Sequence, residues 1–198
     1  MYHKIYFKHG TMFSGKSLNL ISTAKTYEYN KNNVLIIKPV KDTRDPGVIK
    51  SRMSNEELDC ITIKESDCKN IVSIIESYPK KIDVILIDEV QFFPVEGIDE
   101  LVNVSKIAPV ICYGLKTSYT GELFPSVAKL LAIAEDVQEI KTVCRHCSKK
   151  ATHNLLLRNC KPIYNGDMIN VEGENVNEEY QQVCRYHFYN PVLGANND

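Results

Sequence analysis

The segment GTMFSGKS, residues 10–17, places glycines, a lysine and a hydroxyl side chain at the spacing of a phosphate-binding loop. The pattern G-x-x-x-x-G-K-[ST] is matched by Gly10, Gly15, Lys16 and Ser17. Glycines let the backbone bend until successive N–H groups point at a phosphate, and the N-terminus of a following helix adds partial positive charge. We expect Lys16 to bridge the β- and γ-phosphates of a nucleotide and the Ser17 hydroxyl to bind Mg²⁺. The alternative is a glycine turn with only a structural role.

The interior of this loop consists of Thr11, Met12, Phe13 and Ser14. Two of these side chains are apolar, which is unusual beside a polyanion. Because backbone N–H groups hold the phosphate, the side chains can turn away from it. We therefore assign the whole of residues 10–17 to the phosphate contact and expect the Phe13 ring to pack in the core.

An acidic pair follows the apolar run VILI and supplies the second half of a nucleotide site. Asp88 stands at the C-terminal end of a buried strand next to the phosphate loop, where Mg²⁺ needs a carboxylate partner. Neighbouring side chains on a regular strand face opposite ways, so Asp88 and Glu89 cannot both point at the metal. Glu89 is then available as a general base toward a hydroxyl or a water. The alternative is a strand that ends in two solvated acids.

Two paired motifs in the last third of the sequence, C-x-x-C and C-x-x-H, predict a metal site. The ligands are Cys144, Cys147, Cys184 and His187. A Cys₃His set suits tetrahedral Zn²⁺ and leaves no coordination position open, so we expect the zinc to be structural. A redox C-x-x-C is the alternative, but it needs a βαβ context that is absent here. We interpret His153 and Cys160 as bystanders and His146 as a rival to His187.

Short apolar runs bounded by turn residues predict the strands that carry these motifs. They lie at residues 4–10, 33–39, 83–90 and 108–114. Apolar residues spaced by three from Ser17 onward predict a helix directly after the phosphate loop. Further helices are expected at about 66–78, 97–106 and 125–135. Such an alternation is typical of an α/β fold, with a parallel sheet covered on both faces and right-handed crossovers.

The composition changes after about residue 142, where apolar runs become short and polar residues dominate. We expect a nucleotide-binding domain at 1–142, a small zinc domain at 143–190 and a disordered tail at 191–198. The stretch 39–59 is charged and punctuated by proline and glycine. We expect it to be a long loop that is functional or mobile.

The overall composition limits the class of protein. The chain has 198 residues, of which 43% are hydrophobic and 25% charged, enough for one sizeable core and an appendage. Lys and Arg number 24 against 25 Asp and Glu, a balance that disfavours wholesale nucleic-acid binding. There is no signal-peptide pattern and no run of about 18 apolar residues, so we expect neither export nor membrane insertion. Seven cysteines, uneven in number and clustered, indicate a reducing cytoplasm.

Taken together, the motifs resemble a known family. The segments are GTMFSGKS, KDTR, DEVQFF, YGLKTSYTGELF and a C-x-x-C … Y-x-x-x-C-x-x-H ending. In this order and at these separations they resemble the type II thymidine kinases, the zinc-containing family of many bacteria and of the animal cytosol. The resemblance covers residues 3–189. It implies a RecA-like P-loop core with a small zinc domain, and transfer of the γ-phosphoryl group of ATP to the 5′-hydroxyl of thymidine.

The resemblance also implies roles for particular residues. Glu89 would be the base that activates the 5′-hydroxyl, and Arg44 would steady charge on the transferring group. The implied thymine pocket consists of Met12, Phe92, Leu115, Tyr119, Phe124 and Tyr180. Backbone groups before Tyr180 would pair with the base edge, although this segment is two residues longer than the family pattern and carries Glu172 and Glu174. Family members are commonly tetrameric, so the resemblance implies a homotetramer.

Two other classes of protein stay open at this point. A P-loop ATPase or switch protein with a zinc interaction module would use Glu89 to activate water, and its aromatic residues would belong to the core. A zinc-stabilised binding module without catalysis would have no use for the intact Lys16, Ser17, Asp88 and Glu89 set. A test of phosphoryl transfer to nucleosides separates these classes.

Overall fold

The structure of the chain is a computed structural model that describes residues 1–41, 47–168 and 177–192. Its centre is a six-stranded sheet with the strand order β5-β2-β6-β7-β1-β8. The strands are β1 (Ile5–His9), β2 (Val34–Pro39), β5 (Ile61–Ile63), β6 (Val84–Ile87), β7 (Val110–Gly114) and β8 (Asp136–Glu139). Every neighbouring pair is parallel. The predicted α/β fold with a parallel sheet is confirmed.

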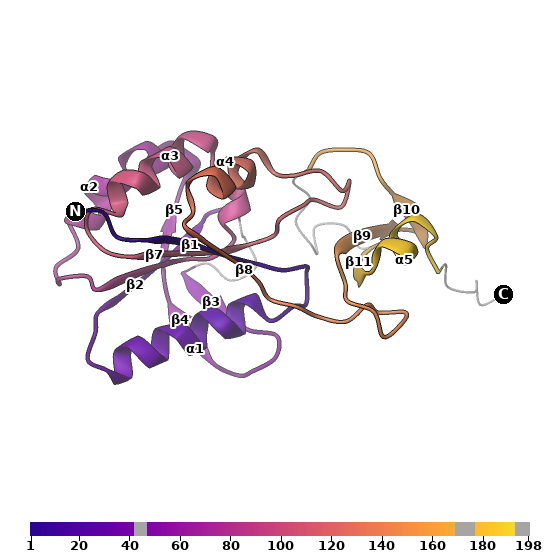
Figure 1. The fold of residues 1–198 in the computed structure, drawn as a ribbon, viewed down its shortest axis with the longest axis horizontal. Coiled ribbons are helices and arrows are strands. Elements are labelled where there is room, and N and C mark those ends of the chain that lie inside the picture. Colours follow the sequence, from indigo (N-terminus) through magenta and orange to yellow (C-terminus); the bar gives the residue numbers. More distant parts are fainter. Residues whose placement is uncertain (42–46, 169–176, 193–198) are drawn as a thin grey trace.

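Helices cover both faces of this sheet. They are α1 (Lys16–Tyr29), α2 (Ile71–Glu76), α3 (Val95–Val104) and α4 (Pro125–Ile133), with a 3₁₀ segment, η1 (Glu65–Asn70), directly before α2. Figure 1 shows α2, α3 and α4 on one face and α1 on the other. The helix predicted at 66–78 is therefore a 3₁₀ turn followed by a short α-helix, whereas the other three predicted helices are present.

The central strands are apolar throughout because each face of the sheet packs against helices. In β6, Ile85 and Ile87 belong to the cluster that includes residues of α2, α3 and α4. Val84 and Leu86 belong to the opposite cluster, together with residues of α1. Because β2, β6, β7 and β1 run parallel, they also end at the same edge of the sheet, with β6 ending two residues before its two neighbours. Loops that follow these strands consequently meet at that edge.

The stretch 39–59 is not simply a loop. It contains the antiparallel hairpin of β3 (Val48–Lys50) and β4 (Glu57–Asp59), which lies on the α1 side of the sheet in Figure 1. Ile49 of this hairpin is buried in the same cluster as α1. Residues 42–46, which include Arg44, lie outside the described residues. The sequence did not indicate the hairpin because each of its strands has only three residues, too few for an apolar run or an alternation to stand out.

Two strands of the main sheet were also missed. β5 has three residues, and the edge strand β8 has the polar sequence DVQE, so neither forms an apolar run. β8 nevertheless pairs with β1 along four residues. An edge strand next to solvent needs no apolar side chains on its open side, which removes the signal that identified the central strands.

A separate three-stranded antiparallel sheet, here called the C-terminal sheet, follows the main sheet in the chain. It consists of β9 (His153–Arg158), β10 (Lys161–Ile163) and β11 (Glu178–Val183), and the short helix α5 (Arg185–Tyr189) packs beside it. Figure 1 shows this unit beyond one end of the main sheet. Its own small core consists of Cys144, Leu155, Leu157, Val183, Cys184 and Phe188. The predicted tail lies outside the described residues from 193 onward.

Within the described ranges, no helix combines the length and the apolar character needed to cross a bilayer.

Two neighbours on α3 test the placement of the core. Leu101 is completely buried, whereas the Val102 side chain is exposed. We expect Leu101→Ala to lower the free energy of unfolding by about 2–5 kcal/mol, because it leaves a cavity under the sheet. Val102→Ala should cost less than about 1 kcal/mol. Urea unfolding of both variants at one fixed zinc concentration measures the difference, and equal losses would contradict this packing.

Candidate active site and metal centre

The phosphate loop connects β1 to α1, as the motif requires. Gly15 has a left-handed backbone (φ 83°) and immediately precedes Lys16, the first residue of α1. A side chain at Gly10 would come within 2.7 Å of the Ile140 carbonyl oxygen, so this position has no room for a Cβ atom. Both glycines are thus needed, one for its conformation and one for space. The Lys16 ammonium group donates to the Thr11 carbonyl at 2.8 Å, across the mouth of the loop.

One backbone N–H of the loop is already engaged by a side chain from the C-terminal sheet. The Met12 N–H donates to Asn154 Oδ1 at 2.7 Å, and the same amide donates from Nδ2 to the Thr117 carbonyl at 3.3 Å. Asn154 is 2% exposed and lies on β9. No local pattern distinguishes this asparagine in the sequence, because its partners are more than 35 residues away.

The two apolar side chains of the loop face the C-terminal sheet rather than the phosphate position. Met12 and Phe13 pack against a small cluster formed by Tyr119, Leu156 and Tyr180. Phe13 is only half-buried, and the Arg52 guanidinium group lies 5.0 Å from the centre of its ring. The expectation of a core Phe13 is therefore only partly met, because the ring also lines a cavity.

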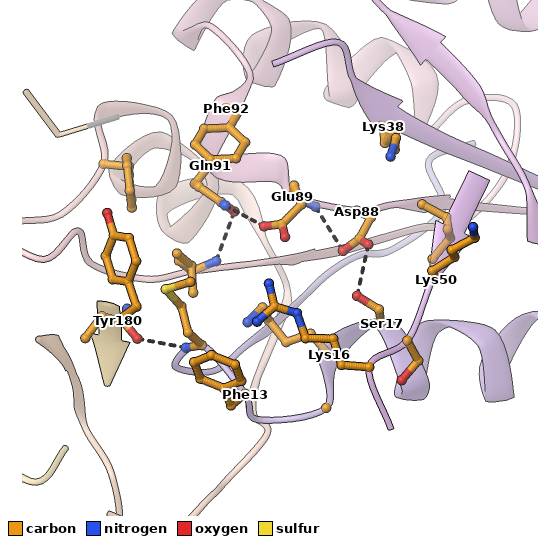
Figure 2. Close-up of a pocket in the computed structure, with 18 of the residues that line it drawn as sticks. Phe13, Lys16, Ser17, Lys38, Lys50, Asp88, Glu89, Gln91, Phe92 and Tyr180 are labelled. Carbon is orange, nitrogen blue, oxygen red and sulfur yellow. Dashed lines mark hydrogen bonds between the residues drawn. The ribbon is translucent and has the colours of Figure 1, made fainter. Parts of the chain in front are cut away.

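The acidic pair lies beyond the end of β6, which stops at Ile87. Asp88 accepts a hydrogen bond from the Ser17 hydroxyl at 3.3 Å and another from the Glu89 N–H at 3.0 Å. Glu89 has a left-handed backbone (φ 49°) and begins a 3₁₀ turn, η2 (Val90–Phe92). Figure 2 shows Asp88 directed at Ser17 and Glu89 directed toward Gln91. The two acids do separate, but through this turn and not through the alternation of a regular strand.

Gln91 joins the acidic pair to the neighbouring strand. Its Nε2 donates to Glu89 Oε2 at 2.6 Å, and its Oε1 accepts the Leu115 N–H at 3.0 Å. Gln91 is 3% exposed. It was missed in the sequence because a glutamine after an acidic pair has no distinguishing spacing.

These groups surround a cavity of about 660 Å³. At one end lie Gly15, Lys16 and Ser17, with Asp88 and Glu89 beside them (Figure 2). The other lining residues include all six side chains of the expected nucleoside pocket: Met12, Phe92, Leu115, Tyr119, Phe124 and Tyr180. Phe92 and Phe124 meet edge to face with ring centres 6.5 Å apart, and Tyr119 and Tyr180 do the same at 6.3 Å. Burial raises the pKa of the Tyr119 phenol, which favours its protonated form.

Three basic side chains that the sequence did not single out also line the cavity: Lys38, Lys50 and Arg52. Lys38, at the carboxyl end of β2, is 1% exposed and donates to the Val48 carbonyl at 3.1 Å. Lys50 is the last residue of β3, and Arg52 lies in the turn between β3 and β4. Together with Lys16 they bring positive charge to the lining of the cavity.

The four predicted metal ligands converge in the C-terminal unit. Their ligand atoms all lie within 4.8 Å of one another. Nδ1 of His187 is 3.3 Å from the sulfur of Cys144 and 3.5 Å from that of Cys184, and the sulfurs of Cys147 and Cys184 are 3.8 Å apart. Tetrahedral Zn²⁺ places two sulfurs roughly 3.8 Å apart and a sulfur and a nitrogen roughly 3.5 Å apart. The residues therefore fit a structural zinc ion.

The chemistry of the ligands supports the same conclusion. Burial opposes ionisation of the Cys144 thiol, but hydrogen bonds from the backbone N–H groups of His146 and Cys184 outweigh it and lower its pKa to about 6. A thiolate is the form that binds zinc. His146, the rival ligand, instead hydrogen-bonds Gln181 through Nε2 at 2.7 Å. His153 stacks on Phe188, and Cys160 is exposed outside the cluster.

Comparison with known proteins identifies the family. The thymidine kinase family model matches residues 3–188. The chain is 40% identical over 193 residues to a thymidine kinase of Streptococcus agalactiae and 38% identical over 193 residues to one of Streptococcus pyogenes. Each match covers 96% of this chain and 99% of the relative. The chain belongs to the thymidine kinase family. Thymidine kinases are ATP-dependent phosphotransferases, and the cavity of this member joins a phosphate loop to an apolar chamber.

The metal centre of this thymidine kinase family member can be tested with two cysteine variants. We expect purified protein to contain about one zinc per chain and Cys184→Ser to lose most of it, with loss of order in the C-terminal sheet. Cys160→Ser is the control, because Cys160 is an exposed cysteine of the same unit outside the ligand cluster. Metal analysis and limited proteolysis report the two effects. Full zinc content in Cys184→Ser would remove this residue from the ligand set.

Proposed function

We propose that the protein transfers the γ-phosphoryl group of ATP to the 5′-hydroxyl of thymidine. The observation that carries this proposal is the single cavity in which the phosphate loop and the acidic pair adjoin six apolar and aromatic side chains. A triphosphate and a flat, methylated pyrimidine need these two environments, and they need them within reach of each other. The identity with thymidine kinases over nearly the whole chain supports the same substrates.

The phosphate end handles the nucleotide. Residues 10–17 form the phosphate loop, in which backbone N–H groups other than that of Met12, together with the Lys16 ammonium group, bind the β- and γ-phosphates. Ser17 and Asp88 are the residues that would hold Mg²⁺, and they offer a hydroxyl and a carboxylate oxygen 3.3 Å apart, the hard donors that this ion prefers. When bound, Mg²⁺ neutralises charge on the phosphates. Arg44 is proposed to add positive charge at the transferring group, although it lies outside the described residues.

The acceptor end receives the nucleoside. The thymine ring is proposed to lie among Met12, Phe92, Leu115, Tyr119, Phe124 and Tyr180. Glu89 takes the proton of the 5′-hydroxyl as that oxygen bonds to the γ-phosphorus, while the bond to the bridging oxygen breaks and ADP leaves. Backbone groups before Tyr180 would pair with the base edge, and residues 169–176 of that segment lie outside the described residues.

A P-loop ATPase or switch protein is the competing function. It requires water beside Glu89 and aromatic residues that serve only as core. Phe92 is half-buried and lines the cavity, as Figure 2 shows, and the buried Tyr119 and Tyr180 also contribute to the lining. Aromatic side chains arranged around an open chamber favour a ligand over a packed core.

The domain boundaries, the oligomeric state and the cellular location belong to the same proposal. We place a kinase domain at 1–142 and a zinc domain at 143–190, since the C-terminal sheet has a small core of its own. Four chains would form a homotetramer, as the family resemblance implies. A cytoplasmic location is proposed as well, because thiolate ligands must stay reduced.

The role of Glu89 predicts a selective loss of chemistry. We expect Glu89→Gln to lower kcat for thymidine phosphorylation by about 10²–10⁴-fold, because the amide cannot accept the proton. ATP binding should be retained. Glu96→Gln, at an exposed position on α3, is the control and should leave kcat unchanged. The assay offers ATP and Mg²⁺ with each of four deoxynucleosides; ATP hydrolysis indifferent to all of them would favour the competing function.

The role of Asp88 predicts a different defect. We expect Asp88→Asn to weaken Mg²⁺-dependent ATP binding by roughly tenfold or more, because the metal loses an anionic partner. Asp99→Asn, which removes a carboxylate paired with Lys129 at the surface, serves as the control. Titration of ATP with and without Mg²⁺ measures the effect. If Asp88→Asn and Glu89→Gln had the same profile of binding and turnover, the proposed division of labour would be wrong.

A further inference from the structure

We infer that Gln91 is a positioning residue that holds the Glu89 carboxylate at the acceptor end of the cavity. The inference rests on the proposed function, in which Glu89 is the base. It adds a residue that makes the base effective without touching the reacting atoms.

Both ends of the Gln91 amide form hydrogen bonds, and the partners determine which end is the oxygen and which is the NH₂ group. Its NH₂ group donates to Glu89 Oε2 at 2.6 Å, and its oxygen accepts the Leu115 N–H at 3.0 Å, as Figure 2 shows by dashed lines. The reverse orientation would set oxygen against a carboxylate and NH₂ against an N–H group. A hydrogen bond to an ionised acceptor is also stronger than one between neutral groups.

The position of Gln91 is fixed from three sides. Its side chain is almost completely buried, and its carbonyl accepts the Ser126 hydroxyl of α4 at 2.9 Å. On the facing strand, a Cβ atom at Gly114 would stand 2.6 Å from Gln91 Oε1 and 2.9 Å from Val90 Cγ1. The missing side chain at Gly114 is what lets the amide reach the N–H of Leu115, the residue directly after β7. This arrangement leaves Gln91 little freedom to move.

Glu89 gains from such a partner because its side chain has several rotatable bonds. The residue lies two positions after the end of β6 and adopts a left-handed conformation, which is strained for a non-glycine residue. A long carboxylate on a turn has several rotamers, and a base must stay in one of them to act. Through Gln91 the carboxylate is tied to Leu115, a residue that lines the same chamber. Gln91 therefore connects the proposed base to the wall of the chamber through two hydrogen bonds.

The test is Gln91→Met, which keeps the length of the side chain and removes both hydrogen bonds. We expect kcat for thymidine to fall by roughly 10- to 100-fold, while KM for ATP and for thymidine change by less than about threefold. The matched control is Gln138→Met. Gln138 also donates to a carboxylate two residues earlier, Asp136, at 3.2 Å, but on the exposed edge strand β8. It should leave kcat unchanged.

A double-mutant cycle decides whether Gln91 acts through Glu89. On the Glu89→Gln background, Gln91→Met should change the remaining kcat by less than about twofold, because the group that it positions is gone. An equal loss on both backgrounds, or no loss on the native background, would overturn the inference. The assignment of Glu89 as the base is tested separately: it would be wrong if Glu89→Gln alone kept a near-native kcat.

A second variant keeps the test valid if Gln91→Met does not fold. Gln91→Glu retains the size of the side chain and an acceptor for the Leu115 N–H, but it replaces the donor that faces Glu89 with oxygen. We expect the same loss of kcat with intact thymidine binding. Thermal unfolding of each variant shows that it is folded, and a Gln91→Glu variant with native kcat would overturn the inference.

Discussion

The left-handed turn at Glu89 is the constraint on which the rest of the site depends. If β6 continued through Asp88 and Glu89, strand alternation would send one of the two carboxylates into the core on the far face. The turn ends the strand at Ile87 and brings both acids to the carboxyl edge of the sheet. Its strain is offset locally, because Asp88 accepts the Glu89 N–H at 3.0 Å and Phe92 donates to the Glu89 carbonyl at 3.0 Å.

The close approach of neighbouring segments at this edge of the sheet also explains two of its glycines. β7 must end in Gly114, since a side chain there would collide with Gln91. The phosphate loop must begin with Gly10, since a side chain there would collide with the chain that leaves β8. At both positions the glycine is selected by the close approach of another segment and not by a positive φ, because Gly10 and Gly114 are absent from the left-handed positions. The site is built by parallel strands that end together and leave their loops little space.

The sequence predicted those parts of the fold and site whose signal is local. Buried central strands need continuous apolar residues on both faces, so β2, β6 and β7 were evident, as were the phosphate loop and the four metal ligands. The hairpin, the edge strand β8 and the residues Gln91 and Asn154 were not evident. Gln91 depends on Leu115, and Asn154 on Met12, which is 142 residues away. A polar side chain whose only distinction is a distant partner leaves no periodicity and no motif to recognise.

The metal centre is placed so that it can support one wall of the cavity. Cys144 and Cys147 precede β9, and Cys184 and His187 follow β11, so an ion bound by all four would hold the two strands at one end. On these two strands, Leu155 and Val183 belong to the small core beside the metal ligands. Asn154, Leu156 and Tyr180 lie on the side of the cavity. Asn154 binds the phosphate loop at Met12, and Tyr180 packs against Tyr119. A structural zinc ion would therefore stabilise a wall of the chamber from outside, without contact with either substrate.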